Sequence, residues 1–184
     1  LRTGIRELMS RKQKQVDEFI SVVRHCCKLL NVELFFGKGK TVRLDSESVR
    51  GYFCPPDGNT AGQLRVATGV PRARWIGVLC HEFGHMSQWF YRDPCFHATL
   101  KDGRDPETVM DRWTAGVNYS PATVQEAFDI IRCYERDADE RAMQFIIDYD
   151  LPVNLDTYKR DSQNMDYSYE QMMNNRKWKY MRRR

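Results

Sequence analysis

The chain has 184 residues, of which 41% are hydrophobic and 29% charged, and its formal net charge is +4 at pH 7. This length and apolar content predict one globular domain with a real core. No stretch approaches the roughly eighteen apolar residues of a membrane span, and no signal-peptide pattern opens the chain, so we expect no membrane association. The first residue is Leu1 rather than methionine, so the sequence is compatible with a missing upstream segment.

Six cysteines occur at positions 26, 27, 54, 80, 95 and 133. Their number is even, but their spacing does not resemble a disulfide framework, and no C-x-x-C pair is present to form a zinc knuckle. Cys80 and Cys133 fall within segments that we predict to be packed helices. We therefore expect reduced, buried thiols in a cytoplasmic protein.

The first third of the chain predicts a long helix followed by short strands. Residues 5–31 carry apolar side chains at helical spacing. Strand-like runs broken by glycine-rich and proline-rich turns follow near residues 32–36, 41–44, 48–54 and 63–68. The expected fold class is α+β, with a short, twisted and mostly antiparallel sheet.

Residues 81–85 read His-Glu-Phe-Gly-His, an HExxH pentad, and this motif is the strongest functional signal in the chain. Residues four apart on a helix share one face, so His81 and His85 can offer two imidazole nitrogens to one metal ion. Glu82 lies beside them, where it can act as a general base toward water on that metal. The motif predicts a zinc hydrolase. The alternative is an amphipathic helix with two half-buried histidines.

The sequence around the pentad predicts that it is helical. Pro71 suits a helix start, and no further proline occurs up to Tyr91. Gly84 is the exception, because a glycine in mid-helix costs about 1 kcal/mol relative to alanine. A glycine kept between two predicted ligands indicates that another backbone packs closely there.

Residues 93–120 are the least regular part of the chain, with several Asp, Gly and Pro residues. A loop of this length between two site helices is often a lid or a substrate wall. Groups that could stabilise the transition state there are His97 and Tyr119, and Tyr134 on the next helix is a third. The alternative for each of them is an ordinary surface or core contact.

The segment 121–149 has a 3.6-residue apolar rhythm and predicts another long helix. A catalytic zinc needs a third protein ligand from outside the pentad. Glu135 and Asp139 share one face of this helix, and small Ala138 beside them lets a second helix approach. Because a carboxylate on a packed face is costly unless it is paired or binds metal, we expect Glu135 to be the ligand and Asp139 to accept the N–H of a ligand histidine. The alternative is a solvated helix face with i,i+4 ion pairs.

HExxH followed by ExxxDxxA, formed here by Glu135, Asp139 and Ala142, resembles the gluzincin pattern. The resemblance is strongest to the small single-domain metallopeptidases of the ImmA/IrrE type, many of which are encoded by phages and mobile elements. It covers roughly residues 15–150 of the chain. The gap of fifty residues between His85 and the glutamate is longer than in compact members, which leaves the third ligand open.

The resemblance implies a small zincin-like domain that binds one Zn²⁺ ion through His81, His85 and Glu135, with Glu82 as the base. It also implies that the strand at 63–68, directly before the pentad helix, forms the sheet edge along which an extended substrate peptide lies. Backbone pairing of that kind gives affinity with little sequence preference.

His97, twelve residues after His85, is the rival third ligand. An HExxH helix, a short loop and a third histidine resemble the SprT-like zinc proteases, some of which act on proteins bound to DNA. His97 can reach the metal if the pentad helix ends shortly before Pro94. Gln88 and Tyr91 stand where the extended metzincin pattern needs glycine and histidine, which excludes that group.

The last part of the chain predicts a polar helix capped near Asn154 and a basic tail. Residues 176–184 contain six basic and no acidic residues, whereas the other 175 residues contain 23 basic and 25 acidic ones. Such a tail can bind nucleic acid or an acidic partner surface, or it is simply a solvated terminus. We assign residues 1–152 to the zincin-like domain and 153–184 to a helical extension of the same globular unit.

Together these features predict a zinc metalloendopeptidase that hydrolyses peptide bonds of a protein substrate, with a zinc-bound water activated by Glu82. One alternative is the SprT-like, DNA-associated protease. A second is a non-catalytic module that keeps the zincin fold for binding or assembly. For the enzyme, Glu82→Gln is expected to abolish turnover and to spare zinc binding.

Overall fold

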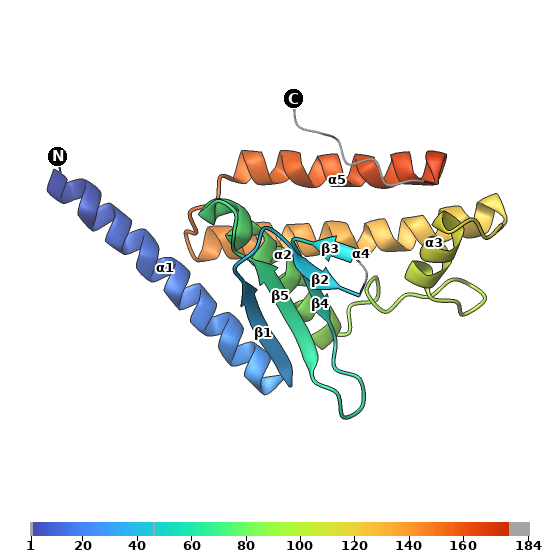
Figure 1. Ribbon diagram of the computed structural model, residues 1–184, viewed down its shortest axis with the longest axis horizontal. Coiled ribbons are helices and arrows are strands. Elements are labelled where there is room, and N and C mark those ends of the chain that lie inside the picture. The colour runs from blue at the N-terminus through green and yellow to red at the C-terminus, as the bar shows by residue number, and fades with distance from the viewer. Residues whose placement is uncertain (1, 46, 177–184) are drawn as a thin grey trace.

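The computed structural model describes residues 2–45 and 47–176, with side chains from residue 11 onward, so all of the predicted basic tail except Arg176 lies outside the described residues. The fold class is α+β, as expected (Figure 1). The elements in chain order are α1 (Arg2–Leu29), β1 (Val32–Gly37), β2 (Val42–Leu44), β3 (Glu47–Val49), β4 (Gly51–Cys54), β5 (Gly62–Ala67), α2 (Arg72–Phe90), α3 (Pro106–Thr114), α4 (Pro121–Asp148) and α5 (Leu155–Asn175).

The main sheet has three strands in the order β1-β5-β4, and β2 and β3 form a separate antiparallel pair. β5 pairs in parallel with β1, Leu34 facing Leu64, and antiparallel with β4, Phe53 facing the same leucine. The expectation that residues 63–68 form a sheet edge is therefore wrong, because both sides of β5 are occupied. Of the two edge strands that the described residues show in this sheet, β1 and β4, the one that packs against Glu82 of the pentad is β4. The prediction failed because strand order depends on contacts between distant segments, which alternation along one strand does not reveal.

Helices α1, α2 and α4 meet one face of this sheet in a common hydrophobic core. Phe19 of α1, Leu64 of β5 and Leu79 of α2 are each fully buried. Burying a side chain of this size contributes about 1.5–3 kcal/mol relative to leaving it exposed. The Phe19 ring contacts Phe83 of α2 at a centroid distance of 5.9 Å and Tyr149, just after α4, at 5.1 Å. This core holds the pentad helix against the sheet.

Gly84 allows α2 to approach α4 closely. A Cβ atom built at this position would lie 2.8 Å from the carbonyl oxygen of Ala138 and 3.3 Å from its Cα. Ala138 and Ala142 are both fully buried. The expectation of close backbone packing at Gly84 is confirmed, and the close approach brings the pentad within reach of side chains on α4.

The segment 93–120 is more regular than predicted, because it contains α3. Asp105 caps this helix by accepting a hydrogen bond from the Thr108 amide at 2.7 Å, and Pro106 occupies the first turn. Val109 and Trp113 of α3 are buried against the rest of the fold. The expectation of an irregular loop was wrong here because the Asp-Pro pair was interpreted as a turn, although it also begins helices.

Helix α5 runs alongside α4 and not away from it (Figure 1). Asn154 caps it as predicted, accepting from the Thr157 amide at 2.8 Å. Arg132 of α4 donates to Asp166 and Glu170 of α5. The segment after residue 152 is thus packed onto the helix that carries Glu135. In the part of the chain that the structure describes, no helix combines the length and the apolar character needed to cross a membrane.

The cysteines differ in part from expectation. Cys27 and Cys80 are free and buried, and burial raises the pKa of the Cys27 thiol to about 12. Cys95 and Cys133 instead form a disulfide, so the expectation of reduced thiols is wrong for this pair. Cys133 lies on an exposed face of α4, against the loop that follows α2, and the sequence separation of 38 between the partners hid this proximity from the sequence.

Candidate metal centre

His81, His85 and Glu135 bring their ligand atoms together between α2 and α4. The two Nε2 atoms of the histidines are 3.1 Å apart. Glu135 Oε2 lies 3.4 Å from His81 Nε2, and Oε1 lies 3.6 Å from His85 Nε2. Zinc–ligand distances of about 2.0–2.2 Å in a tetrahedral site place neighbouring ligand atoms roughly 3.4 Å apart. The three observed separations agree with that geometry.

The tautomer of His81 is set by Asp139. His81 Nδ1 lies 2.9 Å from Asp139 Oδ1. Burial alone would raise the pKa of Asp139, but hydrogen bonds from His81, Ser162 and Tyr158 outweigh it and lower the pKa. Because a carboxylate only accepts, His81 Nδ1 carries a proton, so Nε2 is the ring nitrogen that can give its lone pair to a metal. The structure thus places Asp139 where the sequence suggested.

Two residues of α5 hold Asp139 in turn. The Tyr158 hydroxyl donates to Asp139 Oδ1 at 2.7 Å, and the Ser162 hydroxyl donates to Oδ2. Neither residue was suggested by the sequence, because each lies in a polar helix whose contacts could not be inferred. Asn154, the cap that predicts this helix, was the one available signal. α5 is therefore part of the support of the candidate centre.

Glu82 points toward β4 and is only 7% exposed. A Cβ atom at Gly51 of β4 would lie 3.1 Å from Glu82 Cγ, so glycine leaves room for this side chain. Burial raises the pKa of Glu82 to about 7, while the charge on His81 and a backbone hydrogen bond from Phe53 oppose the rise. A carboxylate with a pKa near neutrality is well suited to exchange protons.

The electrostatics of the three ligand side chains favour a cation between them. Burial would lower the pKa of His81, but hydrogen bonds to Asp139 and Glu135 raise it well above its usual value. Burial lowers the pKa of His85. For Glu135, burial would raise the pKa, but the neighbouring histidines lower it. A carboxylate facing two imidazole nitrogens 3.1 Å apart therefore suits a positive charge, and the N,N,O donor set is one that zinc accepts.

The structure places the other suggested residues differently. His97 is exposed, its Nε2 lies 3.3 Å from the carbonyl oxygen of Trp89, and it is absent from the ligand cluster. Tyr119 packs under the Arg104 guanidinium at 5.1 Å. Tyr134 is beside the site.

The ring of Tyr134 meets the His85 ring at a centroid distance of 5.8 Å, and its hydroxyl donates to Glu107 Oε1 at 2.6 Å. Of the three suggested donors, only Tyr134 is brought to the pentad. Its hydroxyl is engaged by a carboxylate of α3, which the sequence did not suggest as part of the surroundings.

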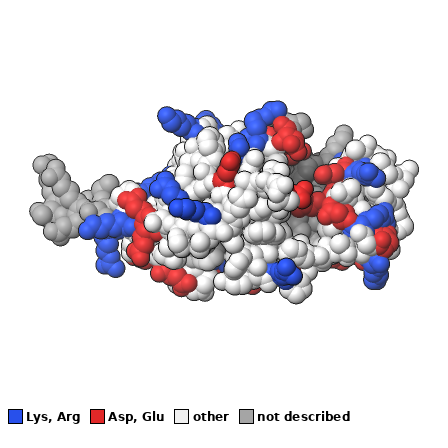
Figure 2. Space-filling view, turned by 90° about the horizontal axis from the view of Figure 1, so that it is seen from below, with Lys and Arg blue, Asp and Glu red and all other residues white. Residues whose placement is uncertain are grey.

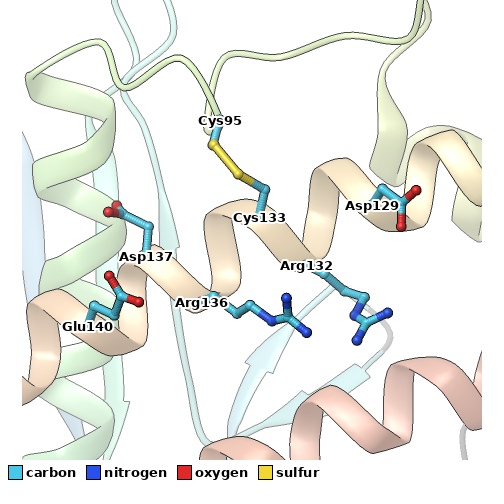
Figure 3. A pocket seen from close by; sticks show the side chains of 7 residues that line it. All are labelled: Cys95, Asp129, Arg132, Cys133, Arg136, Asp137 and Glu140. Atoms are coloured by element: carbon cyan, nitrogen blue, oxygen red, sulfur yellow. A yellow bond between two sulfur atoms is a disulfide. The ribbon is translucent and has the colours of Figure 1, made fainter.

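One face of the molecule carries mixed charges (Figure 2). On the face seen in Figure 2, acidic and basic side chains are interspersed and form no continuous positive field. A shallow pocket lies on another side of α4, between the disulfide and a row of charged residues (Figure 3). Arg132 and Arg136, which line it, are both paired with Asp166 of α5. This pocket contains none of the three ligand residues.

Comparisons of the chain with models of protein families, with curated protein sequences and with solved structures found no match.

Proposed function

We propose that this protein is a zinc-dependent metallopeptidase with a zincin-like fold, in which His81, His85 and Glu135 hold the metal and Glu82 is the general base. The observation that carries the proposal is the convergence of these three side chains from two helices, with a fourth side chain, the buried carboxylate of Glu82, next to them. A structural metal site would need no such additional carboxylate.

Zinc held by these residues would supply Lewis acidity toward a carbonyl and would make a water molecule acidic near neutral pH. Glu82 accepts the proton from the attacking water and passes it to the leaving amine. Its buried position excludes bulk solvent from that carboxylate, and the Phe53 backbone orients it. Asp139 fixes the tautomer of His81 by holding a proton on Nδ1, so Nε2 is the nitrogen available to the metal, and the same hydrogen bond raises its basicity.

The substrate in this proposal is an extended segment of a protein chain that lies along β4. This strand borders Glu82 through Gly51 and Phe53, and its outer edge is unpaired among the described residues. Main-chain hydrogen bonds at such an edge bind peptides with little dependence on sequence. The assignment replaces β5, which is central in the sheet.

The metal content of the purified chain after exhaustive dialysis tests the ligand set. We expect about one zinc per chain in the wild type and its loss in Glu135→Ala, because two histidines alone leave the site one ligand short. His97→Ala is the matched control and should keep its zinc. Absence of zinc from the wild type, or its loss with His97→Ala and not with Glu135→Ala, would contradict the proposed centre.

Catalysis is tested with a peptide library prepared from a digested proteome and analysed by mass spectrometry. Wild-type protein loaded with zinc should generate new peptide termini, and Glu82→Gln should retain zinc but generate none. Equal cleavage by the two proteins would remove Glu82 from the mechanism. Zinc binding without cleavage by the wild type would favour a non-catalytic module with the same fold.

A further inference from the structure

Gln88 is a polar side chain sealed in the interface between α2 and α4. It is fully buried and lies one turn after His85 on the same helix. Its Nε2 donates to the Tyr134 carbonyl oxygen at 2.7 Å and to Asp137 Oδ2 at 2.8 Å. A buried amide without partners would cost about 1–3 kcal/mol, so its retention requires that its polar atoms be used.

The surroundings of Gln88 leave only one orientation of its amide. Two acceptors, the Tyr134 carbonyl and the Asp137 carboxylate, lie at one end, so the amide nitrogen must face them. The opposite end, Oε1, lies 2.9 Å from His85 Nδ1 and can only accept. His85 Nδ1 therefore carries the proton, and His85 Nε2 is left with a lone pair directed at the cluster formed with His81 and Glu135.

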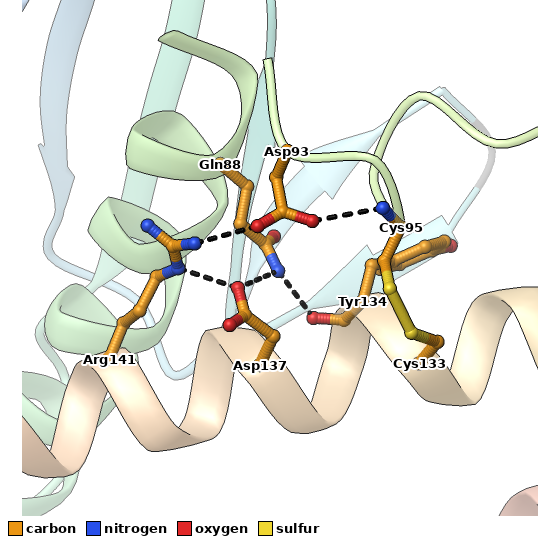
Figure 4. The surroundings of a disulfide bond; sticks show 7 residues. All are labelled: Gln88, Asp93, Cys95, Cys133, Tyr134, Asp137 and Arg141. Atoms are coloured by element: carbon orange, nitrogen blue, oxygen red, sulfur yellow. Dashed lines mark hydrogen bonds and ion pairs between the residues drawn. A yellow bond between two sulfur atoms is a disulfide. The ribbon is translucent and has the colours of Figure 1, made fainter. Parts of the chain in front are cut away.

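Asp137 is itself fixed by a chain of hydrogen bonds that reaches the loop after α2 (Figure 4). Arg141 donates to Asp137 through Nε and to Asp93 Oδ2 through Nη2, the latter at 2.8 Å. Asp93 Oδ1 accepts from the amide of Cys95, the residue joined to α4 by the disulfide. The acceptor that orients Gln88 therefore cannot rotate away without breaking its ion pair with Arg141.

We propose that Gln88 is a positioning residue of the metal centre: its amide selects the metal-binding tautomer of His85 and ties this ligand to α4, the helix that carries Glu135. This inference rests on the proposed metal function. It assigns to a neutral side chain the task that Asp139 performs for His81. Gln88 does not contact the reacting atoms.

The affinity for zinc, measured by competition with a chromophoric chelator, tests this role. Gln88→Met keeps the approximate volume of the side chain but removes both hydrogen-bonding ends. We expect zinc to bind about 10–100-fold more weakly, the range found for partners of metal-ligating histidines. Gln63→Met on β5, which removes an amide that accepts from Tyr52 of β4, is the matched control and should leave zinc affinity unchanged.

A conservative exchange separates positioning from packing. In Gln88→Glu, a carboxyl group that keeps its proton beside the Asp137 carboxylate donates that proton to Asp137, and its other oxygen still accepts from His85 Nδ1. We expect this variant to bind zinc at least fivefold more tightly than Gln88→Met, and equal affinities of the two variants would overturn the inference. If Gln88→Met only weakens the fold, its metal-free melting temperature falls while its zinc affinity stays within twofold of wild type, and the inference is overturned. If the wild type itself binds no zinc, the proposed function fails first.

Discussion

The two histidines of the pentad lie one turn apart on the same helix, yet their Nδ1 atoms have chemically different hydrogen-bond partners, held by different parts of the molecule. His81 donates to the carboxylate of Asp139, which α5 holds through Tyr158 and Ser162. His85 faces the neutral amide of Gln88, which is held within the α2–α4 interface.

The difference between a charged and a neutral partner matters for the net charge of the proposed metal centre. A dication bound at the proposed centre would be balanced by the charges of Glu135 and Asp139. A second carboxylate in place of Gln88 would put negative charge at a fully buried position beside Asp137, and burying an uncompensated charge is costly. One charged and one neutral partner therefore fix both tautomers while keeping the centre close to neutral.

The surroundings of His81 and of His85 also differ in how they are attached to the rest of the fold. Removing the disulfide tests this difference, and we expect it to have the largest effect of the variants considered. The disulfide between Cys95 and Cys133 fastens the loop behind His85 to α4, whereas the His81 side depends on helix packing. For partners 38 residues apart, loop-closure entropy predicts that Cys95→Ser with Cys133→Ser lowers the free energy of unfolding by about 4 kcal/mol. Urea denaturation of the oxidised wild type and the double variant measures it. Reductant should destabilise the wild type alone, and an equal response in both would exclude the disulfide.

Glu82 contrasts with Asp139, the carboxylate that holds His81. The surroundings of Glu82 disfavour its charged form, whereas those of Asp139 favour it. Burial raises the pKa of Glu82 from 4.5 to about 7, so the folded state keeps a proton that the unfolded chain releases. The contribution of Glu82 to the stability of the metal-free wild type therefore falls as the pH rises from 4.5 to about 7, and Glu82→Gln lacks this contribution.

We expect Glu82→Gln to be more stable than the metal-free wild type at pH 8, by on the order of 3 kcal/mol, because each unit of pKa shift corresponds to 1.36 kcal/mol. The difference should shrink to less than about 1 kcal/mol at pH 5. Denaturation of both chelator-treated proteins at the two pH values measures it. A difference that does not change with pH would show that Glu82 is not held in a charge-penalising site.

Removing the charged partner of His81 should weaken the centre more than removing the neutral partner of His85. Asp139→Ala deletes the acceptor and one of the two negative charges that balance the metal, so we expect a loss of zinc affinity at the upper end of the 10–100-fold range, roughly 100-fold. Gln88→Met should lie below it. Chelator competition on both variants ranks them, and a reversed order would mean that the charge of Asp139 does not stabilise the metal.

The sequence predicted well those elements whose signal is local. The apolar rhythm and Pro71 predicted α2, and the rhythm of residues 121–149 predicted α4, so His81, His85 and Glu135 could be proposed as one cluster. Gly84 even indicated the close approach of the two helices.

What the sequence missed depends on contacts between distant segments. Cys95 and Cys133, and the central place of β5 in the sheet, follow only from tertiary structure. Gln88 was interpreted solely as a departure from another zinc-protease pattern, because a glutamine has no spacing rule that marks it as a partner of histidine. Tyr158 and Ser162 were missed for the same reason.

Tyr158→Phe, for which we expect the smallest effect, tests whether α5 influences the proposed metal centre. Tyr158→Phe removes one of the two hydroxyls that donate to Asp139, leaves the Ser162 bond and keeps the aromatic ring next to Gly77. A hydrogen bond to a charged acceptor is worth about 1.5–3 kcal/mol, but most of this affects folding, because the bond is present with or without metal. We therefore expect only a two- to fivefold weaker zinc affinity.

Tyr167→Phe, at an exposed position of the same helix, is the matched control and should change neither stability nor affinity. The same chelator competition, run alongside metal-free melting curves, resolves the two effects. If Tyr158→Phe lowers the melting temperature but leaves zinc affinity equal to that of Tyr167→Phe, α5 stabilises the fold without tuning the metal. A measurable loss of affinity would instead make α5 a functional part of the site, because the orientation of Asp139, and through it the tautomer of His81, would then depend on a helix that contributes no ligand.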